Sequence, residues 1–330
     1  MPDAITTFLK ERSTDAARVV PLTGDASDRR YFRVIPSSGG SFVLALHAQP
    51  FAPGSLPFVN VTGLFAAVPV PVPRIIDEAP GLGILAQEDL GDVTLQAHLG
   101  AASAGEVETL YEQAVDYLVA LQRRGHELED SAYLPFTLAF DVEKLSWEMN
   151  FFVKHFLEAY RGVQLSPALR QALQAELATM VAELAAEPRV LCHRDYHSRN
   201  LMVTPRGLVI IDIQDARLGP DTYDLVSLLR DSYVDLPDAL QDRLIERFRA
   251  ASPRREPRPA FDARFGLMAM QRNLKALGTF GYQATSRANP VYAQYVPRTL
   301  RYVRAGLSRH ARLAGLAEVL GTLVPEVKVA

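Results

Sequence analysis

Hydrophobic residues recur at helical spacing through most of the C-terminal two thirds of the chain. They follow one another at steps of three and four residues between positions 107 and 121 and again between 169 and 184. The second stretch follows Ser166 and Pro167, a pair typical of a helix start because the hydroxyl accepts from an unpaired backbone N–H. Further helices are predicted over 222–231, 236–250, 259–277 and 291–313.

The N-terminal part carries a different pattern, with alternating polar and apolar positions. The alternation runs over 31–34 and returns over 41–47, and residues 36–40 between them read Pro-Ser-Ser-Gly-Gly. Such a pattern predicts a β-hairpin with a polar loop in front of it. An amphipathic helix is predicted over residues 4–18.

A buried strand and a hinge are predicted after this hairpin. Residues 57–72 are apolar and end in alternating prolines, which predict an extended connection. The apolar run at 83–86 predicts the strand, and the polar residues with a glycine at 87–92 predict a hinge between two lobes.

Residues 190–216, with the sequence VLCHRDYHSRNLMVTPRGLVIIDIQDA, carry the clearest chemical motif. Asp195 lies in the pattern H-R-D-x-x-x-x-N that ends at Asn200, and a second acid, Asp212, follows an apolar run. In phosphoryl-transfer enzymes such an aspartate orients the attacking hydroxyl, and the asparagine and second acid hold metal ions. We therefore predict Asp195 as the base and Asn200 with Asp212 as ligands of Mg²⁺, with ATP as the phosphate donor.

Two further residues of this region are predicted to be structural. His193 is expected to support the loop by hydrogen bonding, and Asp224 is expected either to start a helix or to anchor the loop backbone. An alternative interpretation takes His193, Asp195 and His197 as metal ligands of a hydrolase. The remaining histidines stand in no motif, which disfavours that alternative.

The order of these elements predicts an α+β protein with a two-lobed protein-kinase-like fold. A small β-rich lobe comes first, and a larger helical lobe with a short β segment at 189–213 follows. With 330 residues the chain exceeds one typical core. We place a nucleotide-binding lobe at residues 1–88 and a catalytic and substrate-binding lobe at 89–330.

Charge is distributed unevenly along the chain. The net charge is −3, yet residues 243–312 hold fifteen Lys and Arg against three acids. This segment forms either solvated helix faces or an electropositive wall that attracts anionic ligands. No nucleic-acid-binding motif accompanies it, so no nucleic-acid partner is expected.

The N-terminus has no pattern of a signal peptide, and no apolar stretch is long enough to cross a membrane. A single cysteine excludes an internal disulfide. We therefore expect a cytoplasmic protein without a membrane partner, and we favour a monomer.

With these motifs the chain resembles the aminoglycoside phosphotransferase and choline kinase superfamily. Within it the chain is most similar to the bacterial anomeric kinases of N-acetylmuramate and N-acetylglucosamine. The supporting segments are residues 24–34, 88–92, 193–202, 212–216, 219–231, 271–280 and 297–299.

The resemblance implies transfer of the ATP γ-phosphate to the C1 hydroxyl of an amino sugar in peptidoglycan recycling. Alternatives are another small-alcohol kinase of the aminoglycoside or choline type, or a non-catalytic nucleotide-binding scaffold. An acidic pocket would favour cationic aminoglycosides, whereas the basic segment favours neutral or anionic substrates.

Nucleotide contacts are expected from the loop before the hairpin and from the hinge. No Lys or Arg occurs between Arg33 and Arg74, so the strand lysine that grips ATP phosphates in kinases is absent from the expected segment. We hypothesise that Arg30 or Arg33 replaces it. The predicted cofactor-binding residues are Gly24, Asp25, Ala26, Ser27, Arg30, Arg33, Glu88 and Leu90.

Sugar contacts are expected close to the base and in the helical lobe. Arg272 and Lys275 lie one turn apart on a predicted helix and are placed to meet the lactyl carboxylate of N-acetylmuramate. The predicted substrate-binding residues are Arg199, Gln214, Asp215, Glu148, Arg272 and Lys275.

Overall fold

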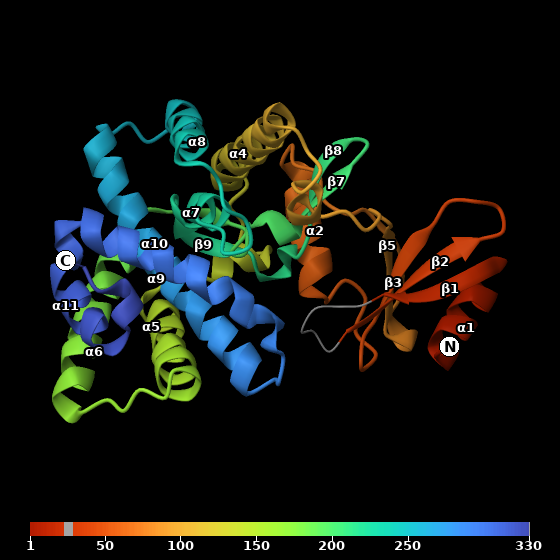
Figure 1. The fold of residues 1–330 in the computed structure, drawn as a ribbon. Coiled ribbons are helices and arrows are strands. Elements are labelled where there is room, and N and C mark those ends of the chain that lie inside the picture. Colours follow the sequence, from red (N-terminus) through yellow and green to blue (C-terminus); the bar gives the residue numbers. More distant parts are fainter. Residues whose placement is uncertain (23–28, 330) are drawn as a thin grey trace.

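The computed structural model describes residues 1–22 and 29–329. A lobe rich in strands joins a larger helical lobe (Figure 1), which confirms the predicted α+β, two-lobed architecture. The smaller lobe holds one antiparallel sheet in the order β1-β2-β3-β5-β4. Its strands are β1 (Ala16–Leu22), β2 (Arg30–Pro36), β3 (Phe42–Leu46), β4 (Ile75–Ala79) and β5 (Ile84–Glu88).

The predicted hairpin is confirmed, and its side chains alternate between the two faces of the sheet. β2 pairs with β3 so that Phe32 lies opposite Leu44. Phe32 and Leu44 are buried with Phe8 of helix α1 (Asp3–Glu11) in a small core. Because side chains alternate along a strand, Tyr31 faces the opposite side, where it lines the cleft between the lobes.

The predicted helix over 4–18 is too long. α1 ends at Glu11, and Ser13 adopts a left-handed φ of 50°, which a continuing helix does not allow. The chain then enters β1, where Val19 pairs with Val34 at the edge of the sheet. Pairing of β-branched residues with a neighbouring strand outweighs the weak helical periodicity of this stretch.

The extended connection predicted from the prolines at the end of residues 57–72 is confirmed, with Val68 in an extended conformation, but the apolar residues before it form a helix that was not predicted. Helix α2 (Pro57–Ala67) comes first, with Pro57 in its first turn and Val61, Leu64 and Phe65 buried. These residues belong to the core of the helical lobe. The last strand of the sheet ends at Glu88, where the boundary between the two lobes was predicted. Helix α2, however, precedes this boundary in the chain and packs in the core of the helical lobe. The division into residues 1–88 and 89–330 therefore stays a prediction.

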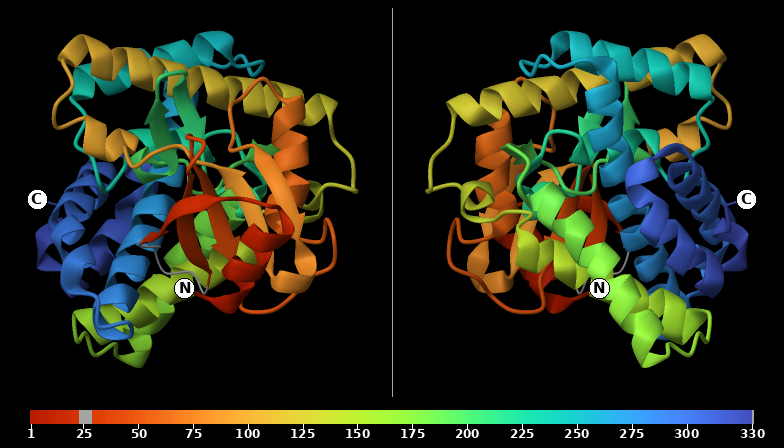
Figure 2. Two further views of the ribbon diagram at one scale, coloured as in Figure 1. Left: turned by 90° about the vertical axis from the view of Figure 1, so that its right-hand side faces the viewer. Right: turned by 90° about the vertical axis from the view of Figure 1, so that its left-hand side faces the viewer.

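Nine helices of the described chain follow the hinge, and α9 lies at their centre, packed against α5, α7 and α10 (Figures 1 and 2). They are α3 (Leu95–His98), α4 (Ala104–Glu127), α5 (Val142–Phe152), α6 (Pro167–Ala185), α7 (Tyr223–Leu229), α8 (Asp238–Ala251), α9 (Arg258–Thr285), α10 (Val296–Arg309) and α11 (Ala314–Leu323).

The long predicted helices are confirmed, with differences at their ends. The Ser166 hydroxyl accepts from Leu169 N at 3.3 Å at the start of α6. α9 continues to Thr285, beyond the predicted end at 277. The predicted helix over 291–313 divides into the 3₁₀ segment η6 (Pro290–Tyr295), α10 and η7 (Ala311–Leu313). α5, which continues as the π-helical segment η3 (Val153–Tyr160), was not predicted.

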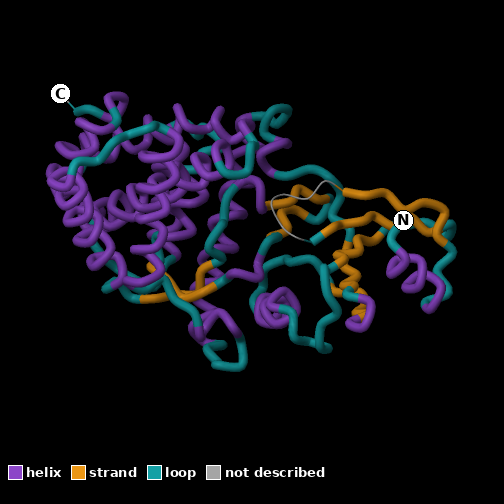
Figure 3. The backbone as a smooth tube through the Cα atoms, turned by 90° about the horizontal axis from the view of Figure 1, so that it is seen from below, coloured by secondary structure: helices purple, strands orange, loops and turns teal. Residues whose placement is uncertain are grey.

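Two short antiparallel sheets of two strands each stand between the helices and carry the central motif. β6 (Arg189–Cys192) pairs with β9 (Arg217–Pro220), and β7 (Leu201–Thr204) pairs with β8 (Gly207–Ile210). Figure 3 shows helices gathered in one lobe and most strands in the other. No helix in residues 1–22 or 29–329 has the length and apolar character required to cross a membrane.

Candidate active site

A cleft of about 960 Å³ lies between the lobes. Tyr31, Val43 and Ala45 of the sheet line one wall, and the hinge residues 87–91 continue it. The loop after β6 and one face of α9 form the opposite wall. The volume is at the upper end of the roughly 300–1,000 Å³ that is usual for small-molecule sites.

Buried hydrogen bonds hold the loop that carries Asp195. The Asp224 carboxylate accepts the backbone N–H groups of His193 at 2.6 Å and Arg194 at 3.0 Å. Arg194 has a φ of 88°, so this turn is strained and requires such support. His193 Nε2 also lies 2.8 Å from Ile211 O. Removal of Asp224 would leave two buried donors unpaired, at about 1–3 kcal/mol each.

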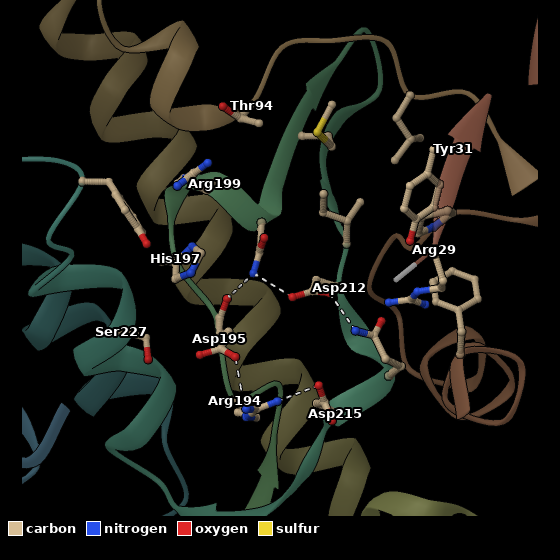
Figure 4. Close-up of a pocket in the computed structure, with 18 of the residues that line it drawn as sticks. Arg29, Tyr31, Thr94, Arg194, Asp195, His197, Arg199, Asp212, Asp215 and Ser227 are labelled. Atoms are coloured by element: carbon tan, nitrogen blue, oxygen red, sulfur yellow. Dashed lines mark hydrogen bonds and ion pairs between the residues drawn. The ribbon is translucent and has the colours of Figure 1, made fainter. Parts of the chain in front are cut away.

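Asp195, Asn200 and Asp212 meet at one point of the cleft (Figure 4). Asn200 Nδ2 donates to Asp195 O at 2.9 Å and approaches Asp212 Oδ2 at 3.4 Å. Asp212 adopts a left-handed φ of 62°, which turns it out of the line of β8. Gln214 Nε2 donates to Asp212 Oδ1 at 2.7 Å. The motif therefore folds into a compact group of oxygen donors.

This group fits a hard divalent cation. A carboxylate and a side-chain amide oxygen are ligands that Mg²⁺ accepts, and substrate phosphates and water complete its octahedron. By contrast, no cluster of three or more His, Cys, Asp or Glu that could hold a metal occurs in the described parts of the chain. His193 faces Ile211, and His197 stands edge-on to Tyr233 with ring centroids 5.2 Å apart. The hydrolase alternative therefore has no support.

Cations surround the Asp195 carboxylate. Lys275 Nζ donates to Oδ1 at 2.9 Å, and Arg272 Nη1 lies 3.6 Å from the same oxygen. Arg194 Nε lies 3.6 Å from Oδ2. Burial alone would raise the pKa of Asp195, but the charges of Lys275, Arg194 and Arg272 outweigh it and hold the pKa well below its usual range. Asp195 is therefore ionised at neutral pH.

The predicted nucleotide contacts fall into three groups. Gly24, Asp25, Ala26 and Ser27 lie outside the described residues. Glu88 and Leu90 line the cleft at the hinge. The Glu88 carboxylate accepts from Arg74 Nε at 3.3 Å and pairs with Arg206, so its side chain links the hinge to the β7–β8 hairpin.

Arg30 and Arg33 do not share a face of the sheet. Arg30 is exposed and borders a separate hollow with Pro2 and Leu46, away from the cleft. Arg33 lines the cleft, where its guanidinium binds Asp89 at 2.6 Å and Asp92 at 2.9 Å. Of the two arginines proposed as alternatives for gripping the phosphates, Arg33 therefore lines the cleft and Arg30 does not.

Arg29 of the smaller lobe lines the cleft and was missed by sequence reasoning, as were Arg194 and Arg230 of the larger lobe. Burial lowers the pKa of His47, and the charge of Arg29 lowers it further, so the two groups are close. The two-residue period of a strand places Arg29, Tyr31 and Arg33 on one face, and this signal was available in the sequence. The cleft-facing positions of β3 hold Val43 and Ala45 in place of a lysine.

The predicted sugar contacts mostly lie together. Arg199, Gln214, Asp215, Arg272 and Lys275 all line the cleft. Asp215 Oδ2 pairs with Arg194 Nη1 at 2.6 Å. Glu148 does not reach the lining; its side chain is fully buried behind Lys275, with Oε1 4.0 Å from Nζ.

Residues 18–260 match the sequence profile of the phosphotransferase enzyme family. The chain belongs to this phosphotransferase family. The matched residues include strands β2 to β5 of the sheet and the loop of Asp195.

Named relatives of this phosphotransferase match almost the whole chain. The N-acetylmuramate/N-acetylglucosamine kinase of Pseudomonas aeruginosa is 33% identical over 93% of this chain and 89% of its own length. The protein of the same name from Neisseria meningitidis serogroup B is 35% identical over 91% of this chain and 89% of its own. The family and kinase activity that the sequence predicted are confirmed.

Solved structures show the same fold at low identity. The gentamicin–APH(2")-IIa complex superposes with a TM-score of 0.60 at 14% identity, covering all of this chain and 99% of that one. The choline kinase LicA of Streptococcus pneumoniae superposes with a TM-score of 0.57 at 13% identity, covering 91% and 99%. They confirm the two-lobed architecture of this phosphotransferase.

Sequence reasoning also missed part of the phosphotransferase cleft. Thr279, Phe280 and Gln283 line it from the end of α9, and Tyr233 and Tyr292 line it from neighbouring segments. The first three continue the spacing of Lys275 along one helix face, but the predicted helix ended too early to include them. No sequence pattern marked the two tyrosines.

Proposed function

We propose that this chain is an ATP- and Mg²⁺-dependent kinase that phosphorylates the anomeric C1 hydroxyl of N-acetylmuramate and N-acetylglucosamine. The observation that carries this proposal is the ionised carboxylate of Asp195, which opens into the cleft beside the oxygen donors of Asn200 and Asp212. The named kinase activity of the relatives supports the choice of sugar.

The part of the cleft beyond Asp195 suits a sugar. Aromatic and uncharged polar side chains line it together with Arg199, and such side chains are usual where a sugar ring must stack and its hydroxyls must bind. Asp231 also borders this part, but its carboxylate accepts from Ser198 and from Tyr233 N. A cationic aminoglycoside would need acidic side chains here, and the surrounding lysine and arginines favour a neutral or anionic acceptor.

The rest of the cleft suits a nucleotide. Leu22, Val43, Leu85, Met202 and Ile211 provide apolar lining next to the hinge. An adenine base fits between such side chains and can bind hinge backbone groups. We place the triphosphate between Arg29 and the Asn200–Asp212 pair, with the γ-phosphate directed to Asp195.

In the reaction the C1 oxygen of the sugar bonds to the γ-phosphorus, and the bond between that phosphorus and the β–γ bridging oxygen breaks, which releases ADP. Asp195 orients the hydroxyl and takes its proton. A hemiacetal hydroxyl is more acidic than an ordinary alcohol, so a carboxylate with a lowered pKa is adequate as acceptor. Mg²⁺ held by Asn200 and Asp212 would neutralise phosphate charge.

A panel of amino sugars, aminoglycosides and amino alcohols tests this proposal. The purified protein should consume ATP with N-acetylmuramate and N-acetylglucosamine, and phosphorus–carbon coupling should place the phosphate on C1. Phosphate on another carbon, or activity with an aminoglycoside in place of these sugars, would contradict the proposal. ATP consumption that depends on an added sugar would exclude a non-catalytic scaffold.

A further inference from the structure

A chain of three buried or half-buried charges leads from the protein interior to the reacting carboxylate. Lys275 of α9 donates to Asp195 Oδ1, and on its other side it approaches Glu148 of α5 at 4.0 Å. The side chains of Lys275 and Glu148 are 15% and 0% exposed. α5 and α9 pack side by side, so this arrangement is part of the lobe's core (Figure 1).

The surroundings of Glu148 are those of a buried negative charge that balances nearby lysines. Its Oε2 accepts from Gln271 Nε2 at 2.8 Å, and its Oε1 makes no hydrogen bond among the described residues. Lys144 Nζ lies 3.8 Å from Oε1. Burial of a carboxylate costs free energy unless cations compensate its charge. The position of Glu148 next to Lys275 therefore indicates that the two charges compensate each other.

The cations around Asp195 differ in what they bind. Arg272 Nη1 donates to Arg194 O at 3.0 Å and to Tyr223 Oη at 2.7 Å, so it braces the loop backbone. Arg194 binds Asp215. Among the residues that the structure describes, Lys275 provides the side-chain hydrogen bond to the Asp195 carboxylate, at Oδ1, whereas Arg194 Nε only approaches Oδ2, at 3.6 Å.

We propose that Lys275 is a positioning residue that holds the Asp195 carboxylate in its reactive orientation, and that Glu148 holds Lys275, so neither residue recognises the sugar. This inference rests on the proposed function. It revises the earlier expectation that Lys275 meets the lactyl carboxylate, because a lysine between Asp195 and Glu148 already has two anionic neighbours.

Three variants test the inference by separating turnover from affinity. Lys275→Met should lower kcat by about 10²-fold, the effect of a small misplacement of a reacting group, with the KM values for sugar and ATP within about twofold. Lys275→Arg, which keeps the charge, should recover most of kcat. Glu148→Gln should lower kcat less, and the double variant should lose no more than Lys275→Met, since the two residues act in series.

A sugar-binding role would give a different result. Lys275→Met would then raise the KM for the sugar and change the ratio between N-acetylmuramate and N-acetylglucosamine, which would overturn the inference. Lys154→Met, an exposed lysine on η3, is the matched control. Thermal unfolding and nucleotide binding of every variant exclude loss of the fold.

A crystal structure of Lys275→Met tests the inference without any assay. The Asp195 carboxylate should leave its wild-type orientation while the loop backbone, held by Asp224 and Arg272, stays in place. An unmoved carboxylate would overturn the inference even in an active enzyme. An inactive wild-type protein would count against the proposed function alone.

Discussion

The two acids of the central motif, Asp195 and Asp212, have contrasting electrostatic surroundings in the cleft. Asp195 is 26% exposed and has Lys275, Arg272 and Arg194 within 3.6 Å of its oxygens. Asp212 is exposed, and its described hydrogen-bond partners are the side-chain amides of Asn200 and Gln214. The same short segment of chain thus holds one acid with three protein cations beside it and one acid whose hydrogen-bond partners in the described residues are neutral.

This difference assigns the two roles. The lysine and arginines around Asp195 repel a divalent cation, and they keep the carboxylate ionised so that it can receive a proton. A carboxylate whose described hydrogen-bond partners are neutral amides keeps its attraction for Mg²⁺. The base and the metal ligand are therefore distinguished by the charged side chains near them. Lys275 and Arg272, which lie next to Asp195, both come from α9.

Replacement of Asp195 by asparagine removes the proton acceptor of the reaction and should lower turnover more than any other change proposed here. Turnover should fall by about 10²–10⁴-fold, the usual range for a positioned proton acceptor. Stability and nucleotide affinity should be retained, because Asp224 and Arg272 still support the loop. Steady-state kinetics with calorimetric ATP titration measure both, and wild-type turnover would remove Asp195 from the mechanism.

On the metal side, Gln214→Leu should raise the Mg²⁺ concentration needed for half-maximal activity by about tenfold. Gln214 orients Asp212 through the 2.7 Å hydrogen bond, and loss of such supporting contacts typically weakens metal binding to this degree. Asp212→Ala should have a larger effect in the same titration. Lys154→Met, at the exposed lysine of η3, is the control. Equal Mg²⁺ dependence in Gln214→Leu and wild type would contradict the assignment.

The sequence predicted the two acids but not their surroundings. Asp195, Asn200 and Asp212 follow from one contiguous motif, and the hairpin follows from strict alternation at 31–34. Arg272 and Lys275 were identified by their charge and their spacing of one helical turn, and their distance from Asp195 depends on how α9 packs against α5 and α7. Such long-range packing leaves no local pattern in a single sequence. The helix predicted over 4–18 was too long for the same reason. Its second half forms β1, because these residues pair with β2, which follows later in the chain.

The pH dependence of turnover offers the finest test of the base side. Burial lowers the pKa of Lys275 to about 8, with the charges of Asp195 and Glu148 raising it and those of Arg272 and Arg194 lowering it. As pH rises through about 8, Lys275 loses its proton and Asp195 loses its hydrogen-bonded cation, so kcat should decline by a few-fold. Glu148→Gln should move this decline to lower pH, because it removes a charge that favours protonated Lys275. Lys275→Arg should abolish the decline, since arginine stays charged. An alkaline limb that persists unchanged in Lys275→Arg would show that another group titrates, and the cationic surroundings of Asp195 would then act through Arg272 and Arg194 alone.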